Sequence, residues 1–201
     1  MRYKQLTLLS ALLFATLLGM AQSATYADSL QAYRHDYMMH HDVIHGKDTV
    51  YFRFFPADES YKVTATFEKI AKANWFKMET SGPIKKIFRV FGVAHFVLHD
   101  TALQLNIYQS QDLLGNDQYH DYLFLPFTDL TTGEESYATG RYLDFRIQDI
   151  HGDKLTIDFN KAYNPNCAYI SNKYNCPVPP KENALPVAIL AGEKAFGKKT
   201  H

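Results

Sequence analysis

The chain has 201 residues, of which 21 are Lys or Arg and 21 are Asp or Glu, so its formal charge at pH 7 is zero. No run of basic residues forms a stripe, and we therefore expect no nucleic-acid partner. The length fits one domain that is large enough to bury its own core.

Residues 1–23 have the pattern of a signal peptide. Arg2 and Lys4 precede an almost continuously apolar run over 6–18, and small residues follow it. The run is shorter than the roughly 20 residues that a membrane-spanning helix needs. We predict a signal peptide over 1–23, export to the periplasm or the extracellular medium, and no integral membrane segment after its removal. An uncleaved membrane anchor is the alternative interpretation.

Residues 24–46 are predicted to form an N-terminal helix. From Tyr26 to about Ile44, apolar and aromatic residues recur at the three- and four-residue steps of one helix face, and Gly46 is a helix-ending signal. This stretch also contains possible metal ligands, namely Met38, Met39, His40, His41 and His45. One helix face offers a metal only two of them. We therefore favour a solvated helix end and predict no metal and no cofactor.

After Gly46 the apolar period changes from helical to two, which is the spacing of strands. Strand-like segments occur at 50–55, 61–67, 76–78, 88–98, 103–108, 122–127, 143–147 and 155–159. Turn residues separate them, and no helix-length insert lies between them. The prediction is a mainly β fold over 47–201, as a single antiparallel β-barrel or β-sandwich domain.

The segment that starts at Gly140 places an arginine on an apolar strand face. In a strand, Arg141 would share its face with Leu143, Phe145 and Ile147. An unpaired buried charge is costly, so this arginine needs a carboxylate partner or an anionic ligand. We favour a bridge between Arg141 and a carboxylate, with a ligand pocket around Arg141 as the alternative.

The region from Asp158 to Lys194 is dense in polar residues that ordinary packing does not require. By strand phase, Asp158 and Asn160 point together, and Glu193 is in phase with inward apolar residues. The candidate ligand-binding residues of the chain are Arg141, Tyr142, Asp158, Asn160, Tyr163, Asn164, Glu182, Asn183 and Glu193.

Cys167 and Cys176 are the only two cysteines of the chain. In an exported protein we expect them to form a disulfide. In the chain-entropy model, closing this loop would contribute roughly 2.5–3 kcal/mol of stability. A pair of metal-binding or reactive thiols is the alternative.

Several blocks of this sequence resemble the family known as domain of unknown function 1684. They include Phe54-Phe55-Pro56, the run from Phe124 to Gly133, Gly140-Arg141-Tyr142 and the whole segment 158–194. The resemblance covers roughly residues 49–196, which is most of the chain without its predicted signal peptide. It implies membership of a family without an established activity, so it predicts no reaction. Similar proteins without an export signal carry the same two cysteines, which leaves the thiol alternative open.

Three functions are compatible with these patterns. The first is an exported binding protein for a small polar or anionic ligand, with Arg141 as the charge anchor and tyrosines as walls. The second is a hydrolase in which two of Asp158, Glu182 and Glu193 act as acid and base. The third is a structural or envelope-interaction protein. The sequence has no Gly-x-Ser-x-Gly elbow, phosphate-binding glycine loop or His-Glu-x-x-His motif, so common enzyme classes gain no support.

Overall fold

The computed structural model describes residues 25–198. The predicted signal peptide, residues 1–23, therefore lies outside the described residues. Within 25–198, no helix combines the length and the apolar character needed to cross a membrane.

The first element is helix α2, Tyr26–Met39. Thr25 caps it, because its hydroxyl accepts a hydrogen bond from Asp28 N and its own N–H is bound by the Asp28 carboxylate. The helix ends five residues before the expected Ile44. The physical reason is His41. Its Nδ1 accepts hydrogen bonds from the backbone N–H groups of Val43 and Ile44, which in a continued helix would donate to backbone carbonyl groups.

Eight antiparallel strands form one sheet, in the order β6-β5-β4-β3-β1-β8-β7, with β2 paired to β3 beside this path. Their bounds are β1 Lys62–Lys69, β2 Phe76–Met78, β3 Lys86–Leu98, β4 Thr101–Ser110, β5 Tyr122–Phe127, β6 Arg141–Arg146, β7 Ile150–His151 and β8 Lys154–Asp158. Short 3-10 turns occupy the connections, at Gly46–Tyr51, Glu59–Tyr61, Ile147–Asp149, Phe159–Lys161, Asn166–Ala168 and Lys181–Asn183. The predicted mainly β antiparallel fold is thus confirmed.

The sheet is not closed into the barrel that was one of the two expected forms, because its path ends at β6 and at β7. The chain after β8 covers the free edge of β6 instead. Tyr142 and Tyr163 exchange two backbone hydrogen bonds of 2.9 and 3.1 Å across this edge. The predicted strand at 50–55 is replaced by a 3-10 turn and a single bridge from Phe54 to Glu193.

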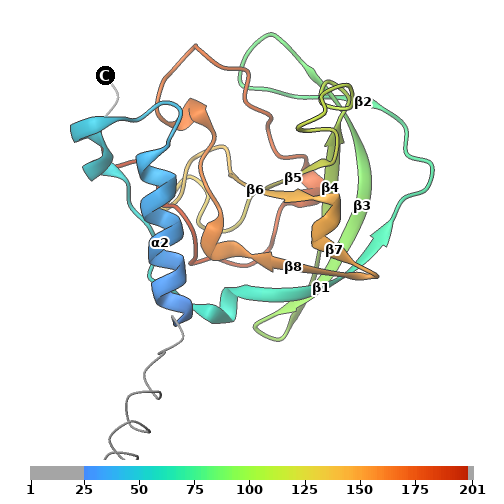
Figure 1. The fold of residues 1–201 in the computed structure, drawn as a ribbon, viewed down its shortest axis with the longest axis horizontal. Helices are drawn as coiled ribbons and strands as arrows, with labels where there is room; N and C mark the ends of the chain where they lie inside the picture. Colours follow the sequence, from blue (N-terminus) through green and yellow to red (C-terminus); the bar gives the residue numbers. More distant parts are fainter. Residues whose placement is uncertain (1–24, 199–201) are drawn as a thin grey trace, which may run out of the picture.

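The sheet is strongly curved, and Figure 1 shows its strands wrapping around the core with α2 on the side opposite β3. Part of the curvature arises in β3, where the register with β4 shifts between Val90 and Gly92. A Cβ at Gly92 would lie 2.2 Å from the Phe67 ring, so only glycine fits beneath this side chain.

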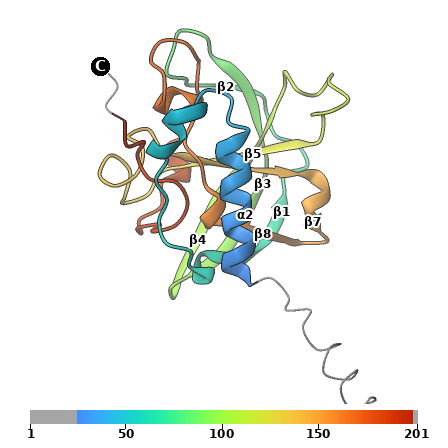
Figure 2. The same ribbon diagram turned by 60° about the vertical axis from the view of Figure 1, so that its left-hand side comes forward.

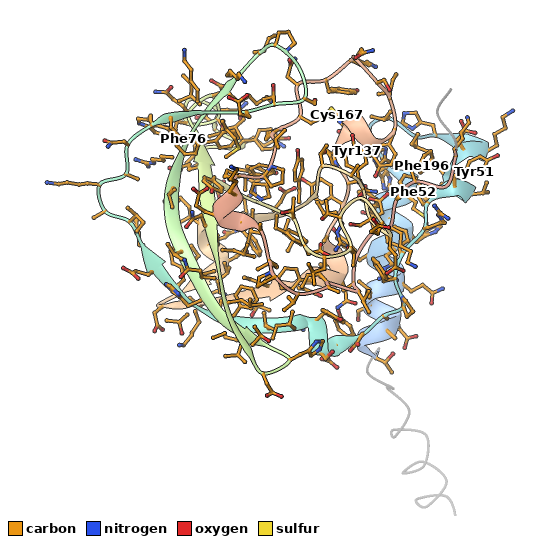
Figure 3. The ribbon with its side chains drawn as sticks, turned by 180° about the vertical axis from the view of Figure 1, so that it is seen from behind. Tyr51, Phe52, Phe76, Tyr137, Cys167 and Phe196 are labelled. Atoms are coloured by element: carbon orange, nitrogen blue, oxygen red, sulfur yellow. A yellow bond between two sulfur atoms is a disulfide. The ribbon has the colours of Figure 1, made fainter. Side chains whose placement is uncertain are left out.

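The core lies inside the curved sheet. Its fully buried members include Leu105, Ile107, Leu125, Phe127 and Phe159. Residues 184–194 pass along this core: Leu185 N donates to Thr128 O, and Glu193 N donates to Ala162 O. A second aromatic cluster lies beside α2, where Tyr51, Phe52 and Phe196 gather (Figure 3). The two clusters hold α2 and the C-terminal segment against the sheet.

Candidate functional site

A cleft that we call the main cleft lies between α2 and the strands β6 and β8. It has a volume of about 720 Å³. Tyr26 and Tyr33 of α2 form one wall, Asp144 of β6 and Asp158 of β8 form the other, and Tyr163 lies between them. Figure 2 brings α2 to the front and shows it crossing the region of β8. The main cleft therefore occupies the place where the sheet fails to close.

Two smaller clefts adjoin the main one. One has about 470 Å³ and is lined by Tyr122, Tyr142 and the segment 174–177, and the other has about 310 Å³ and lies beside Tyr37. Asp144 and Tyr163 line all three clefts. These two residues thus stand at the centre of a continuous hollow surface.

Asp144 is held by tyrosine hydroxyls. Tyr163 Oη donates to Asp144 Oδ2 at 2.6 Å, and the Tyr122 hydroxyl also bonds the carboxyl group. The side chain is open to solvent in the cleft, yet surrounding protein atoms remove part of its hydration, which raises the pKa of Asp144 despite these hydrogen bonds. None of the ion pairs within residues 25–198 involves Asp144.

Asp158 faces the same cleft. Its Oδ1 accepts hydrogen bonds from Tyr26 Oη at 2.9 Å and from Asn160 N at 3.1 Å. The Asn160 side chain also bonds Asp58 backbone atoms, so it anchors the loop before β1 instead of facing a ligand. Asp158 and Asn160 do lie together, as their strand phase indicated, but only Asp158 reaches the main cleft.

Arg141 is not where the anionic-ligand hypothesis requires it. The side chain is fully buried and lines none of the three clefts. Its NH2 donates to Asp129 Oδ2 at 2.8 Å, and its guanidinium also donates to backbone oxygens of Ile189, Ala191 and Glu193. This is the carboxylate bridge that we favoured, with Asp129 as the partner. The NH1 and NH2 groups already donate to protein oxygens, and Nε is buried without a partner, so this side chain offers no donor to a ligand in any of the three clefts.

Glu193 is fully buried and points inward. Its carboxylate accepts hydrogen bonds from tyrosine hydroxyls, whereas Arg141 contacts only its backbone oxygen. Tyr37 donates to Glu193 Oε2 at 3.0 Å, Tyr169 donates to Oε1 at 2.7 Å, and Asn164 N donates to Oε2 at 2.9 Å. Burial raises the pKa of Glu193 to about 7, although these hydrogen bonds oppose the shift. Glu193 therefore joins α2 to the segments that follow β8.

The remaining predicted residues divide between cleft and scaffold. Tyr142 and Tyr163 line the clefts, and Asn164 reaches the smallest one. Asn183 is fully buried and its side chain bonds Asn106 N, Asn106 O and Pro126 O at 2.7–2.8 Å, which is a structural role. Glu182 is exposed and lines none of the three clefts. The predicted acid–base pairs among Asp158, Glu182 and Glu193 do not share a cleft with Arg141.

Cys167 and Cys176 form a disulfide, as expected. Cys176 and its neighbours Tyr174, Asn175 and Pro177 line the cleft that contains Tyr142. The Tyr142 hydroxyl donates to Pro177 O, which ties this loop to β6. The disulfide therefore supports one wall of the hollow surface. Among residues 25–198, no three His, Cys, Asp or Glu side chains come together as metal ligands would.

Asp144 is the central residue that the sequence analysis missed. The alternation of β6 was assigned correctly for Arg141, Leu143 and Phe145, which are buried. The opposite face of the same strand carries Asp144, and it received no role. The available signal was its period-two relation to Tyr142, since the two share a strand face beside Tyr163.

A solved structure is similar to this chain over most of its length. It is the solution NMR structure of an uncharacterised protein of Haloarcula marismortui, with 31% sequence identity and a TM-score of 0.62, covering 83% of this chain and 92% of that protein. No curated protein matches the chain. The sequence model of the protein family of unknown function DUF1684 matches residues 50–194. The chain therefore belongs to the DUF1684 family.

Proposed function

We propose that this is an exported protein that binds a small polar ligand in the main cleft. The cleft itself is the observation that carries the proposal, because about 720 Å³ bounded by α2, β6 and β8 is the size of many small-molecule sites. In this proposal residues 47–201 are one β-rich domain, preceded by the signal peptide 1–23 and the helix within 24–46.

The ligand contacts come from the cleft walls. Asp144 and Asp158 supply acceptors, and Tyr33, Tyr142 and Tyr163 supply flat apolar surface together with hydroxyl groups. Tyrosine suits this task because its ring packs on a ligand while its hydroxyl fixes orientation. Asn164 extends the same surface beside α2. Buried polar residues fix the segments that form these walls, namely Arg141, Asn160, Asn183 and Glu193.

Export is supported by the charged and apolar pattern of 1–23 and by the disulfide, which suits an oxidising compartment. The test is the mass of the protein recovered from outside the cytoplasm of the producing cell. A chain that begins near residue 24 supports a cleaved signal peptide. Recovery of the uncleaved chain in the cytoplasm would contradict export.

A hydrolase with paired carboxylates is the second candidate. Asp144, whose pKa is raised by partial desolvation, and Asp158, whose Oδ1 accepts three hydrogen bonds, line one cleft. Two carboxyl groups that open on one cleft are the groups that acid–base hydrolysis uses. A panel of chromogenic glycosides and esters tests it. Turnover by the wild type that falls at least a hundredfold in Asp144→Asn would support this candidate over simple binding.

The binding proposal is tested by a thermal-shift screen with small polar metabolites. Ser29→Trp places a bulky ring at an exposed position of α2 that lines the main cleft. Gln31→Trp is the matched control, because it is exposed on the same helix and lines none of the three clefts. Compounds that stabilise the wild type and Gln31→Trp, but not Ser29→Trp, support the site. An equal response of all three proteins would place binding elsewhere.

A further inference from the structure

We propose that the ligand of the main cleft carries a positively charged ammonium or amidinium group, and that the Asp144 carboxylate is its counter-ion. This inference rests on the proposed binding function and assigns the chemical class of the ligand. Four features support it, namely the position of Asp144, the tyrosine walls, the charge of the lining and the lack of a metal-ligand cluster among residues 25–198.

Asp144 lies at the meeting point of three clefts, and among residues 25–198 it forms no ion pair, although Arg146 is near enough to favour its ionised form. Tyr163 and Tyr122 give it hydroxyl hydrogen bonds, but no ion pair within residues 25–198 includes it. Partial desolvation disfavours its ionised form and raises its pKa. A bound cation would remove this imbalance, and the attraction would exceed that of a pair in open water because the surrounding protein lowers the local dielectric.

The tyrosines of the main cleft already accept ammonium groups from the protein itself. Lys161 Nζ lies 5.0 Å from the centre of the Tyr33 ring, and Lys62 Nζ lies 5.4 Å from the centre of the Tyr26 ring. Both distances are within the range of cation–π attraction. The aromatic walls of the cleft are thus within reach of cations, with one lysine already over each of these two rings, and the Tyr163 ring lies beside Asp144 with no lysine or arginine over it among residues 25–198.

The lining charge favours a cation over an anion. The main cleft has the carboxylates of Glu59, Asp144, Asp149 and Asp158 against the ammonium groups of Lys62 and Lys161, with His151 at the edge. The cleft that contains Tyr142 adds Asp42 and Asp112 against Lys86. An anionic ligand would meet an excess of negative groups, and the buried Arg141 is already bound to Asp129.

An organic cation fits better than a metal ion. Among residues 25–198, no three His, Cys, Asp or Glu side chains lie close enough together to hold a metal ion, and this includes the carboxylates of the main cleft. Calcium binds six to eight oxygen ligands at short range. An ammonium or amidinium group needs only one carboxylate and aromatic surface, which is what Asp144 and the tyrosines provide.

The experiment compares cations with neutral molecules of the same shape on the unaltered protein. Choline is paired with 3,3-dimethylbutan-1-ol, and 1,5-diaminopentane is paired with pentane-1,5-diol, with agmatine as an amidinium-like probe. Binding is measured by isothermal titration calorimetry at low salt. We expect at least one cation to bind at least tenfold more tightly than its neutral counterpart, and to weaken as salt screens the attraction.

Asp144→Asn should reduce the affinity for that cation at least tenfold, whereas Asp100→Asn should not. Asp100 is the matched control, since it removes the same charge from an exposed turn residue outside the three clefts. The comparison on the unaltered protein decides the proposal even if Asp144→Asn does not fold.

The outcomes separate this inference from the binding function. If neutral counterparts bind as tightly as the cations, or if Asp144→Asn keeps the affinity, the cation proposal is overturned. It is also overturned if no cation binds while other metabolites in the thermal-shift screen respond to Ser29→Trp. In each of these cases the binding function survives. If nothing at all binds in either experiment, both proposals fail.

Discussion

The Arg141 guanidinium and the Asp129 carboxylate meet at 2.8 Å, and neither side chain is exposed to solvent. This pair joins β6 to the turn that follows β5, and the same guanidinium reaches the backbone of residues 189–193. Three separate parts of the chain therefore depend on one buried cation.

Arg141→Met should lower the free energy of unfolding by about 3–5 kcal/mol, because it leaves the Asp129 charge buried without its partner. Chemical denaturation measures this change. Arg146→Met is the control on the same strand, since Arg146 pairs with Asp121 at a partly exposed site and its loss should destabilise the fold far less. Combining Arg141→Met with Asp129→Asn should cost less than the sum of the two single changes. Simple additivity would mean that the pair is not coupled.

The pH dependence of stability should contain two opposing contributions. Burial raises the pKa of Glu193 from its ordinary value of 4.5 to about 7, so the folded state binds more protons between these values and stability falls as pH rises through them. Burial lowers the pKa of His41 from 6.5 to about 4, so its contribution to stability is lost as pH falls from 6.5 to 4. Over about pH 4.5–6.5 the two nearly cancel.

Glu193→Gln should remove the Glu193 contribution to the pH dependence and leave that of His41. Its free energy of unfolding should rise steadily from pH 4 to 6.5, where the wild type is flatter. The difference between wild type and variant should change by about 3 kcal/mol between pH 4.5 and 7. Urea titrations at half-unit pH steps measure it. A pH-independent difference would show that Glu193 does not titrate in this window.

Replacing both cysteines by serine should lower stability by about 3 kcal/mol, because the disulfide closes a loop with a sequence separation of 9. A reducing agent should produce a comparable loss in the wild type and none in the double variant. An unchanged melting temperature after verified reduction of the wild type would argue against a stabilising role. Such a result would return attention to the alternative of functional thiols.

Asn183→Ala should destabilise the fold by about 3 kcal/mol without altering ligand affinity. The amide side chain makes three short hydrogen bonds to the backbone of Asn106 and Pro126, and its removal leaves buried groups unpaired. Glu182→Ala is the neighbouring control, because this exposed residue should change stability by less than about 0.5 kcal/mol. Equal behaviour of the two variants would contradict the structural role of Asn183.

The strand pattern was predictable because period-two alternation and turn residues are local signals. The inward position of Arg141 followed from the same alternation, and the disulfide from the chain having only two cysteines and a predicted signal peptide. What sequence alone did not reveal were partners separated by many residues: Asp129 for Arg141, and Tyr37 for Glu193. The main cleft was also missed, since it arises where α2 meets the gap between β6 and β8. That gap depends on how far the sheet curves, which no short motif encodes.

The contacts of Arg141 also set an order of events during biosynthesis. Its carbonyl partners at 189–193 follow it by about fifty positions, so a chain still emerging from the ribosome has the cation before it has the acceptors. Burying the guanidinium at that stage would be costly. The core around β6 is thus expected to stay open until nearly the whole chain has been made. A nascent polypeptide that resists early folding remains accessible to chaperones throughout its synthesis.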